Sequence, residues 1–350
     1  MLAWLVTMCA SCERVSAAAS PVPEASRWGS VVVEPGQKAS GVLPVPSGSD
    51  GATEIPLTVV RGARPGPVVG VVAGVHGSEY VPILASQRLR EALSPADLAG
   101  TVVLVHAANP PSFFKRTIYA SPVDWKNLNR AFPGKPDGTL TERIAYVLTR
   151  DIIERVDAFI DMHCGDANEA LTPYVGYVTT PDRPLAQRAR AMALVFGVET
   201  IKVRSNPIDP SKSRYSVDTA ASRGKPAIAV EVGQLAQTPD TDVTRVVEGV
   251  HRVLQRLGVL AGEPAPVAHP RWVARSETVS SPVSGIFTPF VAVGQSVEAG
   301  APIGVVRDFF GHVLSEPRAP IAGEILFVTK TPPINAEESV ASVGQLGDAP

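Results

Sequence analysis

The 350-residue sequence predicts an α/β fold with a mixed sheet covered by helices on both faces, followed by a small all-β domain. Between residues 27 and 262, short apolar runs alternate with stretches of helical spacing, which indicates a parallel or mixed sheet with helices packed on it. After residue 270, short β-rich runs are interrupted by glycine and proline. Hydrophobic residues make up 45% of the chain and charged residues 19%, a composition typical of globular proteins.

Composition and charge exclude several classes of protein. The formal net charge is −2, so the chain lacks the basic stripe that nucleic-acid binding requires. No apolar run approaches the ~18 residues that a membrane-spanning helix needs. The three cysteines, Cys9, Cys12 and Cys164, are too few for a disulfide framework. Nothing in the sequence determines the oligomeric state.

The first 26 residues predict a signal peptide and a disordered lead-in. Residues 1–10 are apolar, and residues 17–19 (AAA) form an A-x-A-like cleavage site, although no Lys or Arg precedes the apolar run. Cys12 stands where a lipoprotein would be cleaved and anchored. We therefore expect a periplasmic, secreted or lipid-anchored protein. The alternative is a cytoplasmic protein with a misassigned start codon or a frayed N-terminal tail.

Residues 27–262 are expected to form the main domain, in which buried strands alternate with helices. Continuous apolar runs are typical of strands buried on both faces. They occur at residues 67–75, 101–106, 158–162 and 226–232. Helical spacing occurs at residues 80–92, 139–155, 184–196 and 242–257. Thr139 or Thr141 is available as the N-cap of the second of these helices.

Residues 263–270 (EPAPVAHP) are proline-rich and are interpreted as a linker, and residues 271–350 as an all-β C-terminal domain. Its P-x-x-G turns and the run VGQSVEAG resemble the barrel-sandwich hybrid fold of lipoyl and biotinyl carriers. Those carriers need an exposed lysine at the tip of a hairpin. Lys330, the only lysine in this segment, instead follows a predicted strand, so we expect no prosthetic group there.

Polar residues of the metal-binding type follow the first predicted strand. His76 and Glu79 stand three residues apart, beyond the carboxyl end of the strand, where open α/β sheets bind ligands. An imidazole and a carboxylate are ordinary zinc ligands. The H-x-x-E pattern also occurs by chance, so the pair alone leaves two ordinary loop residues as the alternative.

A second histidine follows another predicted strand, at the same edge of the sheet. His163 would complete the two-His-plus-Glu set of a hydrolytic zinc site, with one position left open for water. Asp161 is available to orient an imidazole from behind. Cys164 would close the site as a fourth ligand and has no paired base nearby, so we expect neither a ligand nor a nucleophile there. A structural histidine is the alternative for His163.

Two further motifs carry groups for substrate binding and proton transfer. Asn129 and Arg130 lie in NLNRAFPG (127–134), and arginine grips a carboxylate through two parallel hydrogen bonds. A surface salt bridge is the alternative for this pair. Glu231 ends the fourth apolar run, and is either a solvated charge or a general base that activates water.

In this order, the four motifs resemble those of the zinc carboxypeptidase fold, and within it those of the succinylglutamate desuccinylase/aspartoacylase family. Asn109-Pro110 fits the Asn-Pro that follows the second strand in many relatives. The matching segments are GVHGSEY (74–80), NLNRAFPG (127–134), DMHCGD (161–166) and EVGQ (231–234). The resemblance covers residues 55–257 and implies a zinc-carboxypeptidase-like mixed sheet.

The resemblance implies a ligand set and a base. His76, Glu79 and His163 would bind one Zn²⁺ per chain. Glu231 would take a proton from the attacking water and later protonate the leaving amine.

The resemblance also implies substrate-binding residues. Asn129 and Arg130 would hold a substrate carboxylate. Arg116 would polarise the scissile carbonyl, although its spacing to Arg130 is one residue longer than in relatives. The helix behind the first motif and residues 166–176 would line the pocket.

The implied activity is hydrolysis of an amide bond in a small substrate that bears a carboxylate, such as an N-acyl amino acid. The same site would serve a metallocarboxypeptidase or an esterase, and the sequence does not separate these. A serine hydrolase is disfavoured because no G-x-S-x-G motif occurs. The non-enzymatic alternative is a zinc-containing or apo binding protein. The β domain is expected near the active site or at a subunit interface, where it could gate substrate size.

Overall fold

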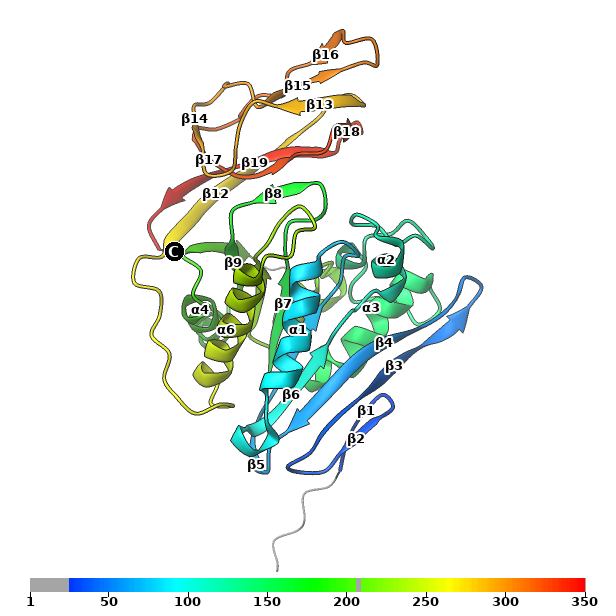
Figure 1. Cartoon of the computed structure of the whole chain (residues 1–350). Helices are drawn as coiled ribbons and strands as arrows, with labels where there is room; N and C mark the ends of the chain where they lie inside the picture. The colour runs from blue at the N-terminus through cyan, green and yellow to red at the C-terminus, as the bar shows by residue number, and fades with distance from the viewer. Residues whose placement is uncertain (1–24, 206–208, 350) are drawn as a thin grey trace, which may run out of the picture.

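The computed structural model of the chain describes residues 25–205 and 209–349 (Figure 1). The predicted signal peptide falls outside the described residues, as does the lead-in up to residue 24. In the described ranges, no helix is both long enough and apolar enough to cross a membrane.

A mixed sheet of 13 strands forms the centre of the fold, as the apolar runs predict (Figure 1). Its strands lie in the order β14-β17-β19-β12-β10-β9-β11-β7-β5-β6-β4-β3, and β8 pairs with β17. Those that precede the C-terminal segment are β3 (Lys38–Gly48), β4 (Gly51–Arg61), β5 (Arg64–Ala73), β6 (Ala99–Val105), β7 (Ala158–His163), β8 (Glu169–Leu171), β9 (Tyr174–Thr179), β10 (Thr200–Ser205) and β11 (Ala227–Glu231). A separate pair, β1 (Ser26–Trp28) and β2 (Val31–Val33), lies at the beginning of the described chain.

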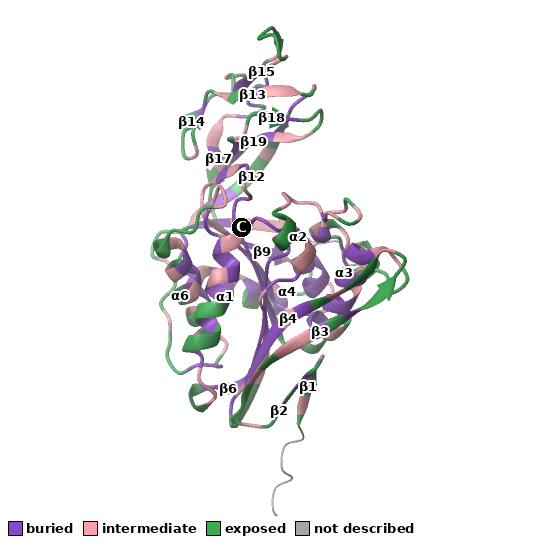
Figure 2. Ribbon diagram, turned by 45° about the vertical axis from the view of Figure 1, so that its right-hand side comes forward, coloured by how far each residue is buried: buried purple, intermediate pink, exposed green. Residues whose placement is uncertain are grey.

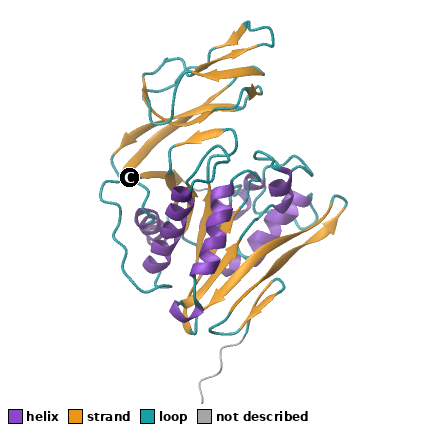
Figure 3. Cartoon of the chain, in the orientation of Figure 1, coloured by secondary structure: helices purple, strands orange, loops and turns teal. Residues whose placement is uncertain are grey.

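Helices cover both faces of this sheet (Figure 3). On one face lie α1 (Tyr80–Ala92), α4 (Arg183–Val195) and α6 (Asp240–Arg256), and on the other α3 (Leu140–Asp151) and α5 (Ser216–Ala221). Successive residues of a strand alternate between the two cores, so that Val71 of β5 packs in the first and Val72 in the second. The central strands are therefore buried on both sides, which explains their continuous apolar runs (Figure 2).

The helices follow the prediction closely, with one shortened end. α1 has the predicted bounds. α3 begins after Thr139, whose backbone N–H donates to Glu142 Oε2 at 3.0 Å. It ends at Asp151, and a separate 3₁₀ turn, Ile153–Arg155, occupies the end of the predicted helix. A short helix that was not predicted, α2 (Pro110–Lys115), begins at the Asn-Pro pair.

From Arg271 onward, every described element is a strand (Figure 3). These are β12 (Arg271–Ser280), β13 (Gly285–Pro289), β14 (Ser296–Val297), β15 (Gly304–Arg307), β16 (Val313–Ser315), β17 (Gly323–Thr329), β18 (Pro333–Ile334) and β19 (Ser339–Gly347). β12 pairs in parallel with β10 and antiparallel with β19, so the central sheet continues into this segment. The predicted domain boundaries and the barrel-sandwich hybrid fold stay predictions.

Three adjacent strands position the functional residues. β5, β7 and β11 are neighbours and run parallel. Their carboxyl ends therefore meet at one edge of the sheet, as the sequence predicts. His76 and Glu79 follow β5, His163 ends β7, and Glu231 ends β11.

Candidate active site

Two glycines shape the loop that carries His76 and Glu79. Gly74 has a φ of 70°, and a side chain at Gly77 would meet the carbonyl oxygen of Ser112 at 2.2 Å. The chain can therefore turn tightly from β5 into α1, which begins immediately after Glu79. His76 and Glu79 are both buried, with 8% and 3% of their surface exposed.

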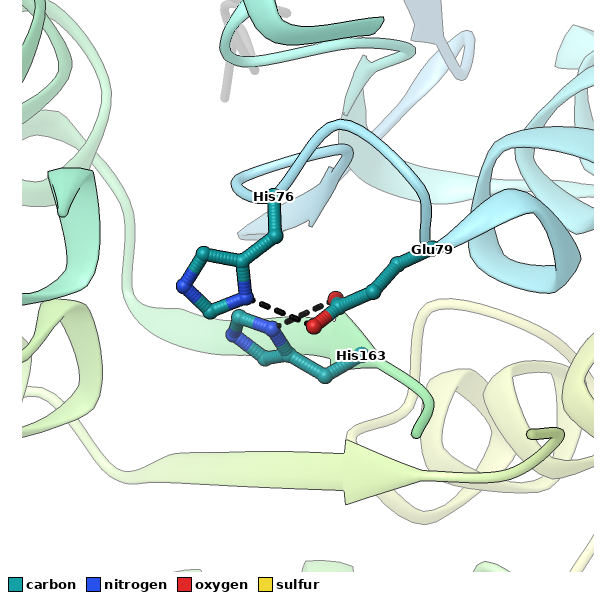
Figure 4. Close-up of side chains that lie close together, drawn as sticks. All are labelled: His76, Glu79 and His163. Carbon is teal, nitrogen blue, oxygen red and sulfur yellow. Dashed lines mark hydrogen bonds and ion pairs between the residues drawn. The ribbon is translucent and has the colours of Figure 1, made fainter. Parts of the chain in front are cut away.

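These two residues meet His163 at the end of the neighbouring strand, and Figure 4 shows both imidazoles facing the Glu79 carboxylate. Nδ1 of His76 lies 2.6 Å from Oε1 of Glu79, and Nδ1 of His163 lies 2.8 Å from Oε2. The ligand atoms of the three residues all lie within 4.8 Å of one another. Two imidazole nitrogens and one carboxylate form the donor set of a catalytic zinc site with an open position.

The second nitrogen of each imidazole, Nε2, contacts an oxygen on the side of the ring away from Glu79. Nε2 of His163 lies 2.9 Å from Asp161 Oδ2, and Nε2 of His76 lies 3.1 Å from Asn127 Oδ1. An oxygen at each Nε2 favours a proton on that nitrogen, which in the neutral ring leaves Nδ1 as the atom able to bind a metal. Such partners orient ligating histidines in metal sites. Asp161 thus occupies the orienting position expected from the sequence.

The charges of this cluster fit a bound cation. The raised pKa values of the two imidazoles favour a proton between each Nδ1 and an oxygen of Glu79, and a divalent cation would replace these protons and bind all three groups. Burial would raise the pKa of Glu79, but the two imidazoles outweigh it and lower the pKa to about 2. Burial would lower the pKa of His76, and the Glu79 carboxylate reverses the shift, so this pKa is raised.

Glu231 has the surroundings of a general base. It pairs in register with His163, and paired residues on neighbouring strands face the same side of the sheet. Burial raises its pKa to about 8, and the charges of Glu79 and Glu169 act in the same direction. A carboxyl group with a pKa near neutrality can both accept and return a proton.

Asn129 and Arg130 also face this cavity. Asn129 is fixed by Ser216, whose backbone N–H donates to its Oδ1 at 3.0 Å, and its Nδ2 lies 3.3 Å from Nε2 of His163. The Arg130 guanidinium lies 4.4 Å from the centroid of the Tyr215 ring and is exposed. Its charge acts on the Asp218 carboxylate, which pairs with Arg204 at 3.2 Å. Within 4.0 Å, no ion pair of the described residues involves Arg130 itself.

Arg116 is not brought into the cavity. It ends α2 in the left-handed conformation, with a φ of 56°, and lines a different pocket beside Tyr80 and Phe113. The structure therefore gives no support to its predicted role at the scissile carbonyl. Among the described residues, the cations that line the cavity are Arg130, Lys202 and Arg204.

The cavity has a volume of about 490 Å³ and extends beneath the C-terminal strands. Of the predicted segment 166–176, it is lined by Glu169, Leu171, Tyr174 and Gly176, whereas α1 contributes no lining residue. Three strands of the C-terminal segment contribute Ser276, Thr278, Leu326, Phe327 and Ser342. This segment therefore lies at the candidate active site, one of the two locations expected from the sequence.

Sequence reasoning missed several lining residues. The Tyr119 hydroxyl donates a hydrogen bond to Glu169 Oε1 at 2.7 Å, and the Tyr119 ring contacts the His76 ring edge-on. Lys202 and Arg204 lie two residues apart on β10, so both project from the same face of that strand. In TIKVRS (200–205), apolar and basic residues alternate, and this pattern could have indicated a strand with Lys202 and Arg204 on one face.

Cys164 has the surroundings of a structural residue, although it adjoins His163. Only 2% of its surface is exposed. Burial raises the pKa of its thiol, which disfavours the reactive thiolate.

The fold and this site define a class of protein, and comparison with known families gives the same class. Residues 65–257 match the sequence model of the "Succinylglutamate desuccinylase/Aspartoacylase catalytic domain". The chain belongs to the succinylglutamate desuccinylase/aspartoacylase family, which confirms the resemblance found in its motifs.

Individual relatives cover most of the chain. An N-alpha-acetyl-L-2,4-diaminobutyric acid deacetylase from Halomonas elongata is 32% identical over 279 residues, which are 77% of this chain and 79% of the relative. The crystal structure of a succinylglutamate desuccinylase/aspartoacylase from Rhodobacter sphaeroides has a TM-score of 0.77 at 28% identity, covering 89% of this chain and 96% of that one. The product-bound structure of the ectoine utilization protein EutE (DoeB) from Ruegeria pomeroyi has a TM-score of 0.78 at 27% identity, covering 88% and 95%.

Proposed function

We propose that this chain is a zinc-dependent hydrolase that cleaves the amide bond of N-acyl amino acids or similar small substrates bearing a carboxylate. The observation that supports this proposal is the register of Glu231 with His163, which sets a carboxyl group one strand away from a two-His-plus-Glu cluster. Both residues line the same cavity. A metal centre with an adjacent general base can catalyse hydrolysis by activating a water molecule.

The donor set and its supports suit zinc. His76, Glu79 and His163 would hold the zinc ion, which would supply acidification of a water molecule and polarisation of a substrate carbonyl. Oxygens of Asp161 and Asn127 lie at Nε2 of the two imidazoles, which favours Nδ1 as the ligand atom.

Glu231 moves the proton. It accepts one proton from the attacking water, whose oxygen adds to the acyl carbon. It then gives that proton to the nitrogen as the carbon–nitrogen bond breaks. One amide and one water thus yield a carboxylic acid and an amine.

Arg130 positions the substrate. Its guanidinium lies over the Tyr215 ring, and its charge acts on the Asp218 carboxylate, which pairs with Arg204. A substrate carboxylate would pair with the Arg130 guanidinium through two parallel hydrogen bonds. The name of the H. elongata relative, a deacetylase of an N-acetylated amino acid, supports an amide substrate of this kind.

A substrate panel tests the proposal. Zinc-loaded wild type and Glu231→Gln are compared on N-acetyl amino acids, dipeptides and simple esters, with acetate and amine release as readouts. We expect cleavage of N-acetyl amino acids, and a loss of about 10³-fold in Glu231→Gln with the metal retained.

Each other outcome has a definite meaning. Cleavage of dipeptides alone would indicate a carboxypeptidase, and cleavage of esters alone an esterase. A Glu231→Gln variant within about tenfold of wild type would exclude Glu231 as the base. If the zinc-loaded wild type cleaves none of these compounds, the proposal is wrong and a binding protein is favoured.

A further inference from the structure

The hairpin of β15 and β16 carries two phenylalanines at its turn, in the part of the C-terminal segment that lies farthest from the helices (Figure 1). The Phe309 and Phe310 side chains are 91% and 86% exposed. Val313 and Leu314 of β16 follow them and are also exposed. An apolar patch of this kind on a protein surface is typical of a contact with another molecule. We call these four residues the hairpin tip.

The turn holds the two phenylalanines in a defined position. The backbone N–H groups of Phe310 and His312 donate to Asp308 Oδ1 at 2.8 and 2.9 Å. The Asp308 N–H donates to the carbonyl oxygen of His312 at 3.0 Å, and Gly311 has a φ of 89°. Asp and Gly suit such a turn, whereas its backbone geometry does not call for two phenylalanines. Because the tip is already ordered, it loses little conformational entropy when it binds a partner.

A second apolar feature lies between α1 and α2, in the part of the chain that precedes the C-terminal strands. The Tyr80 and Phe113 rings contact each other edge-on at 5.9 Å between centroids, and the Phe113 and Phe114 rings do so at 5.4 Å. Phe114 is 73% exposed. Further aromatic side chains pack well on such a row of rings. The row borders a pocket of about 410 Å³, whose lining includes Tyr80, Ile83, Leu84, Phe113, Phe114 and Arg116.

The pocket and the hairpin tip carry opposite charges. Arg116 lines the pocket and is exposed, and among the described residues it forms no ion pair within 4.0 Å. Asp308 directly precedes the two phenylalanines, and its carboxylate pairs only with the exposed His312, at 2.9 Å. A guanidinium beside one apolar surface and a carboxylate beside the other give the two surfaces electrostatic complementarity.

The hairpin tip and the pocket of one chain do not meet. The tip is exposed, and no residue of the C-terminal strands lines the pocket in the described ranges. A contact between the two would therefore join two copies of the chain. A lipid surface is the less favoured partner of the tip, because anionic membranes attract segments with an excess of basic residues. Around the tip, Arg307 and Arg318 are offset by Asp308 and Glu316.

We propose that the hairpin tip of one copy docks into the pocket between α1 and α2 of a second copy, with Asp308 facing Arg116. The contact joins two different surfaces, so it is either exchanged reciprocally in a two-fold dimer or repeated head to tail. Tyr80 directly follows Glu79, so the second copy lies next to the loop that carries two of the proposed metal ligands. The contact does not depend on the proposed function.

Sedimentation velocity of the purified protein, from low to high micromolar concentration, tests this contact. We expect wild type to associate. The double variants Phe309→Ser/Phe310→Ser and Phe114→Ser/Arg116→Glu should each raise the dissociation constant at least about tenfold. All four side chains are exposed, so both variants should fold, which circular dichroism checks.

Trp125→Ser is the matched control for these variants. Trp125 is an aromatic residue with 78% of its surface exposed, and it belongs neither to the hairpin tip nor to the pocket. This variant should associate as wild type does. A mixture of the two double variants is the sharpest test, because each keeps the surface that the other has lost. The mixture should form a heterodimer through one intact contact.

Four results would overturn the proposal. The first is a wild type that stays monomeric, and the second is association that survives in both double variants. The third is a mixture that fails to associate although wild type does, since the tips would then contact each other. The fourth is binding of the monomer to phosphatidylcholine vesicles that Phe309→Ser/Phe310→Ser abolishes, which would assign the tip to a lipid surface.

Discussion

Glu231 and His163 are direct register partners on the parallel strands β11 and β7, and both side chains line the cavity. Neighbouring strands lie about 4.8 Å apart, so the sheet itself fixes the spacing between the proposed base and a proposed metal ligand. Any metal bound between His163 and Glu79 therefore has Glu231 as a neighbour. This relationship depends on backbone pairing rather than on a mobile loop.

Removing the charge behind His163 should weaken metal binding without destroying the site. Asp161→Asn keeps the shape of a side chain that contacts both His163 Nε2 and Ser216 Oγ. Loss of such a partner typically lowers metal affinity about 10–100-fold. Competition with a chelator measures the change in affinity for zinc.

The matched control for Asp161→Asn is Asp137→Asn. Asp137 is exposed on the loop before α3, and its variant should bind zinc as wild type does. An Asp161→Asn variant with unchanged zinc affinity would show that this carboxylate does not support the metal.

Gly176 should tolerate alanine but not a large side chain. A Cβ atom there would meet Ala229 O and the Tyr174 ring at 3.8 Å, which is ordinary contact. Gly176→Ala should therefore fold and gain about 0.5 kcal/mol in unfolding free energy, with kcat/KM within about threefold of wild type. Gly176→Leu should fill the cavity floor and lower kcat/KM at least about tenfold. If both variants are equally active, Gly176 does not border the substrate.

His106 should make the fold less stable in mild acid. It lies between Thr58 Oγ1, 2.8 Å from Nε2, and Ser86 Oγ, 2.9 Å from Nδ1. Burial lowers its pKa to about 4, and the nearby Arg90 acts in the same direction. The unfolded side chain titrates near pH 6.5, so between pH 6.5 and 4 the unfolded state binds the extra proton. The unfolding free energy should therefore fall with decreasing pH in this window, by up to about 1.4 kcal/mol per pH unit from this group.

Chemical denaturation at several pH values measures this effect as a difference between variants. His106→Gln should cost some stability at pH 7 but show a shallower decline between pH 6.5 and 4. His251→Gln, on the exposed side of α6, should decline as wild type does. Parallel curves for wild type and His106→Gln would contradict a depressed pKa at His106.

The sequence could predict the edge of the sheet that holds the candidate site, because buried parallel strands are apolar on both faces. His76, His163 and Glu231 each follow such a run, so their convergence required only the rule that parallel carboxyl ends meet. β10 lacks this signal, because one of its faces lines a polar cavity. Lys202 alternates there with the buried Ile201, so β10 is not a continuous apolar run.

Arg116 shows the limit of spacing arguments. The chain from Arg116 to Arg130 contains three non-glycine residues with positive φ, namely Arg116, Tyr119 and Trp125. Each such residue reverses the local direction of the chain in a way that residue counting does not anticipate. Tyr119 enters the cavity, and Arg116 points to a different pocket.

Zinc content of the purified protein, wild type beside His163→Ala, is the most direct test of the central claim. We expect about one zinc per chain in wild type, and almost none in His163→Ala, with both proteins folded by circular dichroism. Glu79→Gln should lose the metal in the same way, which guards against a variant that fails to fold. A folded wild type that takes up no zinc, even after incubation with excess metal at neutral pH, would contradict the account.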